Sequence, residues 1–167
     1  MNVVSLVRRT AEALALFGGA LLLMAALASA LSITGRGLFA SPLPGDYELV
    51  ELACAAAIFL FLPYCHLVRG HVVVDFALAW APESLQRALD RLINLVFAVV
   101  SFVLLWRLVA GGLDMARFGE TSMILAIPLW VGFVPGAIGL ATLGAICLLR
   151  VLGSIEAPAP TAEGRSS

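Results

Sequence analysis

Residues 121–149 read TSMILAIPLWVGFVPGAIGLATLGAICLL and contain no charged side chain. A helix needs about 20 apolar residues to cross the hydrocarbon core of a bilayer, and this run is longer than that. Arg150 follows the run directly, where a charged side chain can return to the membrane interface. The stretch therefore predicts a transmembrane helix over about residues 123–149, interrupted by Pro128 and Pro135.

The composition of the whole chain is also typical of a membrane protein. Of its 167 residues, 62% are hydrophobic and 13% are charged, and the mean hydropathy is +1.04, whereas soluble domains carry about 25% charged residues. The net charge of −1 gives no basic footprint, so we expect no nucleic-acid partner. Cys54, Cys65 and Cys147 form no CxxC pair and are odd in number, which implies neither a zinc site nor a disulfide framework.

Three more apolar stretches predict three further spans, at about residues 11–34, 48–67 and 88–110. The fold class is then an all-α membrane protein with one four-helix transmembrane domain over residues 1–150. Residues 151–167 are rich in Pro, Ala, Gly and Ser, and we expect them to form a disordered cytoplasmic tail.

The first span has an alternative interpretation as a cleaved secretory signal peptide. Arg8-Arg9, the following Leu/Ala run and Ala28-Ser29-Ala30 imitate the three regions of such a peptide. The apolar run is longer than the usual middle region of a signal, and the three later spans need an inserted start. These two points favour an uncleaved membrane anchor.

Glycine and proline indicate where the connections between spans lie. A loop is expected over residues 36–47, where Gly37, Pro42, Pro44 and Gly45 disfavour a helix. A second short loop is expected over 114–122, after Gly111 and Gly112 relax the chain. Between the second and third spans, Pro82 suits the first turn of a helix. The charges of Glu83, Arg87, Asp90 and Arg91 make that helix start amphipathic, so we expect it at the cytoplasmic membrane surface.

The orientation follows from the distribution of arginine. With both ends inside, seven arginines lie in cytoplasmic segments: Arg8, Arg9, Arg69, Arg87, Arg91, Arg150 and Arg165. Three lie outside: Arg36, Arg107 and Arg117. Because basic residues favour the cytoplasmic side, the sequence predicts that the N-terminus and the C-terminus are both inside.

No ionisable residue is expected in the middle of a span, where it would cost several kcal/mol. The charges of Glu12, Glu48, Glu51, Arg107 and Arg150 all lie near span ends, within snorkelling reach of an interface. We therefore expect no proton relay or ion pathway made by this chain alone, no catalytic residue, no metal and no cofactor.

Two motifs allow more than one interpretation. His66 and His71 could suggest the haem-binding membrane anchor of a respiratory enzyme, but they lie five residues apart at one membrane edge, which favours interfacial hydrogen bonds to a loop or to headgroups. Glu48 and Glu51 share a helical face and could bind a cation, cap a loop or pair with an arginine of a neighbour. Capping and pairing are favoured.

Small residues form stripes on the fourth span. Gly132, Gly136 and Gly144 lie at multiples of four, which lets helix backbones approach closely in lipid. The stripe fits either internal packing of the four helices or a surface for a partner.

The order of several short motifs resembles the small membrane subunit (DctQ type) of tripartite ATP-independent periplasmic (TRAP) transporters. The motifs are Glu48-Leu49-Val50-Glu51-Leu52, Gly70-His71-Val72-Val73-Val74-Asp75, Gly119-Glu120-Thr121-Ser122 and Ile127-Pro128-Leu129-Trp130, followed by Pro135-Gly136. The resemblance covers about residues 14–150. The motifs at 70–75 and 127–130 disfavour the small subunit of a different tripartite carboxylate transporter.

The resemblance implies a scaffold in the bacterial inner membrane with no enzymatic activity. Its partners would be a large, roughly twelve-span permease subunit, a periplasmic substrate-binding protein and membrane lipid, in sodium-coupled uptake of an organic acid. The loops at 42–47 and 114–120 would face the binding protein. Candidate partner contacts are Gly132, Gly136, Gly144, Glu48, Glu51, Arg107 and Glu120, and His71 with Asp75 would form a structural cytoplasmic motif.

Overall fold

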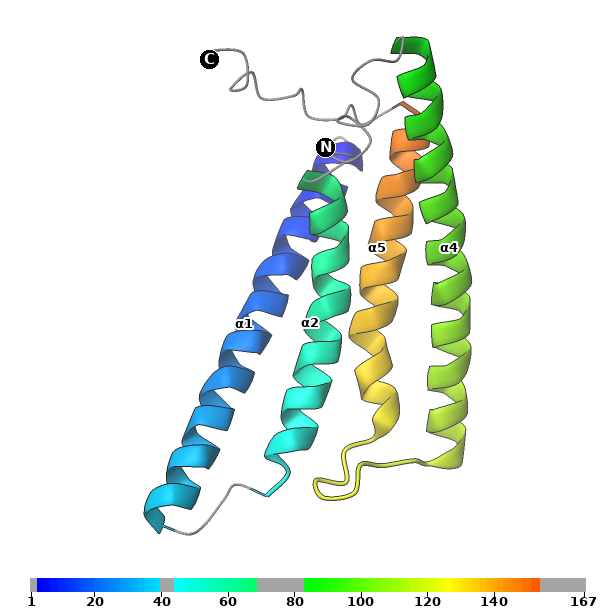
Figure 1. The fold of residues 1–167 in the computed structure, drawn as a ribbon. Helices are drawn as coiled ribbons and strands as arrows, with labels where there is room; N and C mark the ends of the chain where they lie inside the picture. The colour runs from blue at the N-terminus through cyan, green and yellow to red at the C-terminus, as the bar shows by residue number, and fades with distance from the viewer. Residues whose placement is uncertain (1–2, 40–43, 69–82, 154–167) are drawn as a thin grey trace, which may run out of the picture.

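The computed structural model describes residues 3–39, 44–68 and 83–153, and nearly all of them are helical. The elements are α1 (Val3–Phe39), α2 (Asp46–Val68), α4 (Glu83–Phe118), the short 3-10 helix η1 (Leu129–Gly132) and α5 (Phe133–Val151) (Figure 1). Four helical stretches are long and apolar enough to cross a membrane: Val4–Gly37, Asp46–Val68, Leu85–Phe118 and Leu129–Val151. The prediction of an all-α protein with four spans is confirmed, and the orientation and the amphipathic helix start stay predictions.

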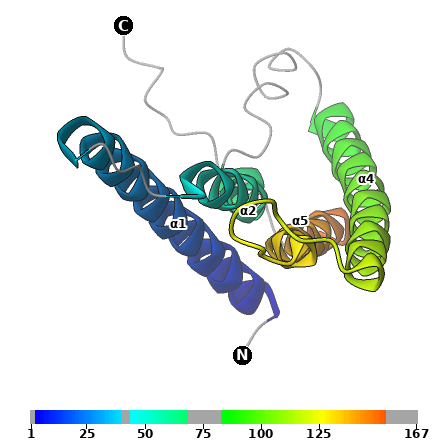
Figure 2. The same ribbon diagram turned by 90° about the horizontal axis from the view of Figure 1, so that it is seen from below.

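The four long helices form an open row and not a closed bundle. Seen from below, they follow one another in the order α1, α2, α5, α4 (Figure 2). α1 packs on α2, α2 on α5, and α5 on α4, while α1 and α4 occupy opposite ends of the row. α2 and α5 run in the same direction, and each has an antiparallel neighbour on its outer side (Figure 1). The layer is one helix deep, so most helices keep two broad apolar faces uncovered.

Glycines let α5 and α1 approach α2 closely. A Cβ atom added at Gly139 of α5 would overlap the carbonyl oxygen of Phe59 in α2 and lie 2.8 Å from its carbonyl carbon. A Cβ atom at Gly18 of α1 would lie 3.3 Å from Cβ of Leu60. Close backbone approach through small residues is how helices associate in lipid, where dispersion contacts replace the hydrophobic effect.

Two of the expected loops are instead helical. α1 continues through Gly35 and Gly37 to Phe39, and α4 continues through Gly111 and Gly112 to Phe118. A glycine costs a helix only about 1 kcal/mol, whereas a backbone group left unpaired in lipid costs several kcal/mol, so the helix persists. The loops predicted over 36–47 and 114–122 were therefore wrong for most of their described residues.

The fourth span begins later than expected. Residues 123–128 are not helical, and the helical part starts with η1 at Leu129. Instead, Thr121 and Pro128 form an isolated antiparallel bridge that closes a loop. The lack of charge over 121–128 predicts part of a span, but four backbone amides of this segment instead donate within the loop or to a side chain of α2.

Candidate functional site

One end of the row carries a structured loop, which we call the loop end. It comprises the turn at Gly45, the first turn of α2 and the loop over residues 119–128 (Figure 1). Large apolar side chains are exposed in the loop, where Met123 is fully exposed and Ile124 is 60% exposed, and Phe118 at the adjoining end of α4 is 78% exposed. Such side chains are costly to present to water, so this end is suited to contact a partner or the membrane interface.

A single carboxylate on α2 holds the loop. Ser122 Oγ donates to Glu48 Oε2 at 2.8 Å, the amide of Ile124 donates to Oε1 at 2.8 Å, and the amide of Leu125 donates to Oε2 at 2.9 Å. We call these three bonds the Glu48 clasp. They join residues more than 70 positions apart, so the clasp fixes the loop to the start of α2. Glu48 could have bound a cation, capped a loop or paired with an arginine. These contacts agree with the capping of a loop.

Bonds within the loop complete its shape. The amide of Ser122 donates to the carbonyl of Ile127 at 2.9 Å, and the amide of Ile127 donates to Ser122 Oγ at 3.1 Å. Ala126 has a φ of 52°, in the left-handed region that non-glycine residues rarely adopt. Gly45 has a φ of 80° and lies against Leu125, whose side chain leaves no room for a Cβ atom at that glycine.

A pocket of ≈ 580 Å³ opens beneath the loop, between α2, α4 and η1. Its lining is mainly apolar, with Glu48 and Glu51 at the polar end; the other lining residues include Leu52, Phe59, Leu108, Met115 and Phe133. Pockets of this size and lining are common sites for an apolar ligand or a partner's side chains.

The remaining charged candidates are exposed. Glu51 and Arg107 lie on the helices α2 and α4, and Glu120 lies in the loop, where its carbonyl accepts from the amide of Leu129 at 3.0 Å. Their carboxylates and guanidinium are therefore accessible to a partner, and their role as contacts stays a prediction.

The glycine stripe of η1 and α5 packs against other helices of this chain. A Cβ atom at Gly136 would lie 3.2 Å from Leu108 Cδ2, and one at Gly144 would lie 3.1 Å from Phe102 Cζ, both on α4. A Cβ atom at Gly132 would lie 2.9 Å from Leu52 Cδ2 on α2. Of the two interpretations of the stripe, these contacts favour internal packing over a partner surface.

The opposite end of the row contains a buried polar cluster. His66 Nε2 lies 3.0 Å from Asn94 Oδ1 and 3.4 Å from Cys147 Sγ, so one ring joins α2, α4 and α5. Arg150 is buried as well, and its Nη2 donates to the carbonyl of Leu67 at 3.0 Å. Both side chains thus contact polar groups of neighbouring helices, and the expected bond of His66 to a loop or to headgroups stays a prediction.

The other proposed motif lies outside the described residues. His71 and Asp75 fall in the segment 69–82, so the structural cytoplasmic motif stays a prediction. In the part of the chain that the structure describes, no group of three or more His, Cys, Asp or Glu side chains is arranged to hold a metal ion. His66 already faces Asn94 and Cys147, an arrangement that gives the haem interpretation no support.

Sequence reasoning missed several residues that the fold depends on. Ser32 and Asn94 are buried polar residues within spans, and Ser32 Oγ donates to Asp46 Oδ2 at 2.6 Å. A polar residue inside an apolar run is the available signal, because it must find a partner there. Gly139 does not belong to the glycine stripe, whose members are spaced by multiples of four residues. Ser122 is noticeable in the sequence only as part of the motif over residues 119–122.

The comparisons with known proteins agree with the fold. A family model described as "Tripartite ATP-independent periplasmic transporters, DctQ component" matches residues 25–157, which include the C-terminal part of α1 and all of α2, α4, η1 and α5. No curated protein and no solved structure matches the chain.

Proposed function

The chain belongs to the DctQ component family of tripartite ATP-independent periplasmic transporters, and from this membership we propose that it scaffolds the large permease subunit. It is a multi-pass membrane protein and the small permease subunit of such a transporter. In the proposal, the assembly lies in the bacterial inner membrane and takes up an organic acid together with sodium. A periplasmic binding protein delivers the substrate, and this chain performs no covalent chemistry.

The observation that carries the scaffold proposal is the open, one-helix-deep row. Each helix packs mainly on its neighbours in the row, so large apolar side chains such as Leu16, Ile58 and Val99 remain more than half exposed. A closed bundle would turn such residues inward. A layer that buries so little of its own surface is suited to lie along the flank of a larger membrane protein.

The loop end supports a second part of the proposal, contact with the binding protein. The Glu48 clasp gives the loop a fixed shape, and Met123 with Ile124 projects from it. Preorganised loops bind with a smaller loss of conformational entropy than flexible ones. The contact surface proposed from the sequence thus moves from residues 114–120 to the loop over 119–128, because 114–118 belong to α4.

The transport test separates a scaffold from a carrier. The chain reconstituted alone in liposomes is expected to move no organic acid, with or without a sodium gradient. Uptake is expected only when the large subunit and the binding protein are added. The measurement is accumulation of a panel of radiolabelled dicarboxylic and sugar acids. Sodium-dependent uptake by this chain alone would contradict the scaffold proposal.

Orientation has its own test at the two ends of the row. A cysteine at Met123, in a variant without native cysteines, is expected to react with a membrane-impermeant maleimide in intact spheroplasts. A cysteine at Leu152, which is 75% exposed, is expected to react only after lysis, since arginine favours that end for the cytoplasm. The reverse pattern would place the loop end in the cytoplasm and remove it from the binding protein.

A further inference from the structure

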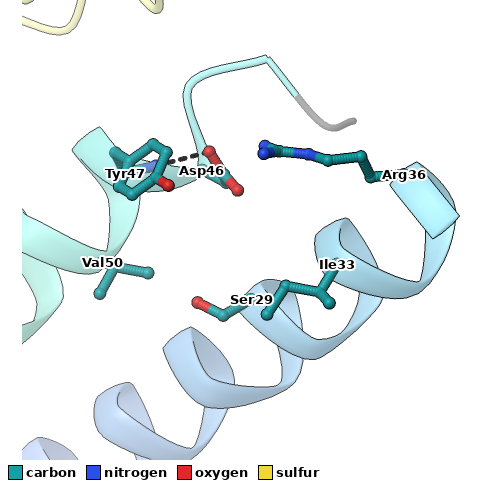
Figure 3. Close-up of a pocket in the computed structure, with 6 residues that line it drawn as sticks. All are labelled: Ser29, Ile33, Arg36, Asp46, Tyr47 and Val50. Carbon is teal, nitrogen blue, oxygen red and sulfur yellow. Dashed lines mark hydrogen bonds between the residues drawn. The ribbon is translucent and has the colours of Figure 1, made fainter. Parts of the chain in front are cut away.

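A second pocket, of ≈ 260 Å³, opens between α1 and α2 at the loop end (Figure 3). Its lining residues are Ser29, Ile33, Arg36, Asp46, Tyr47 and Val50. Arg36 lies in the last turn of α1 and Asp46 in the first turn of α2, so the pocket is located where two spans end. Spans end where hydrocarbon gives way to lipid headgroups, and the pocket therefore lies at headgroup depth.

The two charged residues of this pocket face each other without pairing. Figure 3 shows the Arg36 side chain extended towards Asp46, yet no salt bridge joins the two within the residues that the structure describes. The Asp46 carboxylate is held in place, because Ser32 Oγ donates to Oδ2 at 2.6 Å and the amide of Tyr47 donates to Oδ1 at 2.9 Å. A fixed anion and an extended cation thus border one small space.

The remaining lining is apolar or amphipathic and open to the surroundings. Ile33 is 71% exposed and Tyr47 is 75% exposed, while Val50 and Ser29 are half-buried (Figure 3). Tyrosine is enriched at headgroup depth because its ring is apolar and its hydroxyl is polar. The pocket therefore offers one positive group, one negative group and an apolar wall that continues along α1.

We propose that this pocket binds the headgroup of a zwitterionic phospholipid with a primary ammonium group. The guanidinium of Arg36 receives the phosphate, to which its planar fork of donors is well matched. The ammonium group donates to the lone pairs of Asp46 that Ser32 and Tyr47 leave open. One acyl chain lies against Ile33 and Val50.

Size and charge both favour this ligand over other lipids. The volume of ≈ 260 Å³ lies below the range of about 300–1,000 Å³ typical of sites that enclose drug-sized ligands, so a headgroup fits with the start of one acyl chain while the rest of the lipid remains outside. An anionic lipid without an ammonium group would satisfy Arg36 and leave Asp46 facing another negative charge. A headgroup with both charges satisfies each side chain.

The test is native mass spectrometry of the full chain released from nanodiscs that hold equal amounts of phosphatidylethanolamine and phosphatidylglycerol with identical acyl chains. The wild type is expected to retain phosphatidylethanolamine in excess, by about tenfold if one charge-assisted hydrogen bond decides the choice. Arg36→Gln should lower total retention of lipid phosphate, and Asp46→Asn should bring the ratio of the two lipids close to one. Arg117→Gln is the matched control, because Arg117 is an exposed arginine in the last turn of α4, next to the loop end.

The possible outcomes distinguish lipid binding at this site from unfolding of the variants. Unchanged melting temperatures of the variants would show that their effects come from lipid binding and not from unfolding. A wild-type preference for phosphatidylglycerol, no preference at all, or a preference that survives Asp46→Asn would overturn the proposal, as would unchanged lipid retention in Arg36→Gln. Equal retention of phosphatidylcholine, whose methylated nitrogen cannot donate a hydrogen bond, would overturn the role given to Asp46. Because the site needs only a membrane, failure here would leave the scaffold proposal intact.

Discussion

Gly139→Ala is expected to separate α2 from α5 and to lower the amount of folded chain in the membrane more than an alanine at Gly136 or Gly19. The added Cβ atom would overlap the carbonyl oxygen of Phe59 and lie 2.8 Å from its carbonyl carbon. A backbone cannot move aside as a side chain can, so the two helices must shift. Overpacking of this kind typically costs about 1–3 kcal/mol and sometimes more.

Matched substitutions test the reason for the effect. Gly136→Ala places its Cβ atom 3.2 Å from Leu108 Cδ2, the end of a flexible side chain, so a smaller loss is expected. Gly19→Ala meets nothing within 4 Å and should be neutral or slightly favourable. The measurement is the melting temperature of each purified variant with its yield from membranes. Equal stability of Gly139→Ala and Gly19→Ala would show that α2 and α5 are not in close contact.

The glycine pattern shows how far sequence reasoning reaches in this protein. Spacing by four residues identified Gly132, Gly136 and Gly144, and all three do face neighbouring helices. The closest contact is nevertheless at Gly139, three residues after Gly136. The crossing angle of α5 with α2 decides which small residue meets the backbone of the other helix. That angle depends on every contact in the row.

The number and the approximate positions of the spans were predictable because each depends on local composition. A helix in lipid needs only a long enough apolar run, and all four runs are present. The helix ends were less predictable. Gly111 and Gly112 predict a break, but Gly112 instead gives room to Phe133, since its Cβ atom would lie 3.1 Å from Cβ of that residue.

The side-chain network at each end of the row was not predictable in the same way. His66, Asn94 and Cys147 come from three helices, and nothing in the spacing of these residues indicates that they meet. The same holds for the loop over 119–128. Its residues 121–128 lack charge, and the carboxylate that satisfies its amides comes from α2, more than 70 positions earlier.

Glu48→Ala is expected to release that loop. The variant loses the two amide bonds from Ile124 and Leu125 and the hydroxyl bond from Ser122. Hydrogen bonds to a charged group contribute about 1.5–3 kcal/mol each, so amide exchange at Ile124 and Leu125 should accelerate by at least about tenfold. Hydrogen exchange followed by mass spectrometry measures this directly. Glu51→Ala is the matched control, because Glu51 lies one turn further along α2 and is exposed.

The part played by Ser122 allows a second test of the same arrangement. Its hydroxyl donates to Glu48 and accepts from the amide of Ile127, so it connects the clasp to the internal bonds of the loop. Ser122→Ala alone should therefore accelerate exchange at Ile127 as well as at Leu125. The effects of substitutions within one hydrogen-bond network are not additive. Ser122→Ala should therefore accelerate amide exchange less in the Glu48→Ala background than in the wild type. Full additivity would mean that the loop is held by its own bonds, and that Glu48 lies beside a structure it does not stabilise.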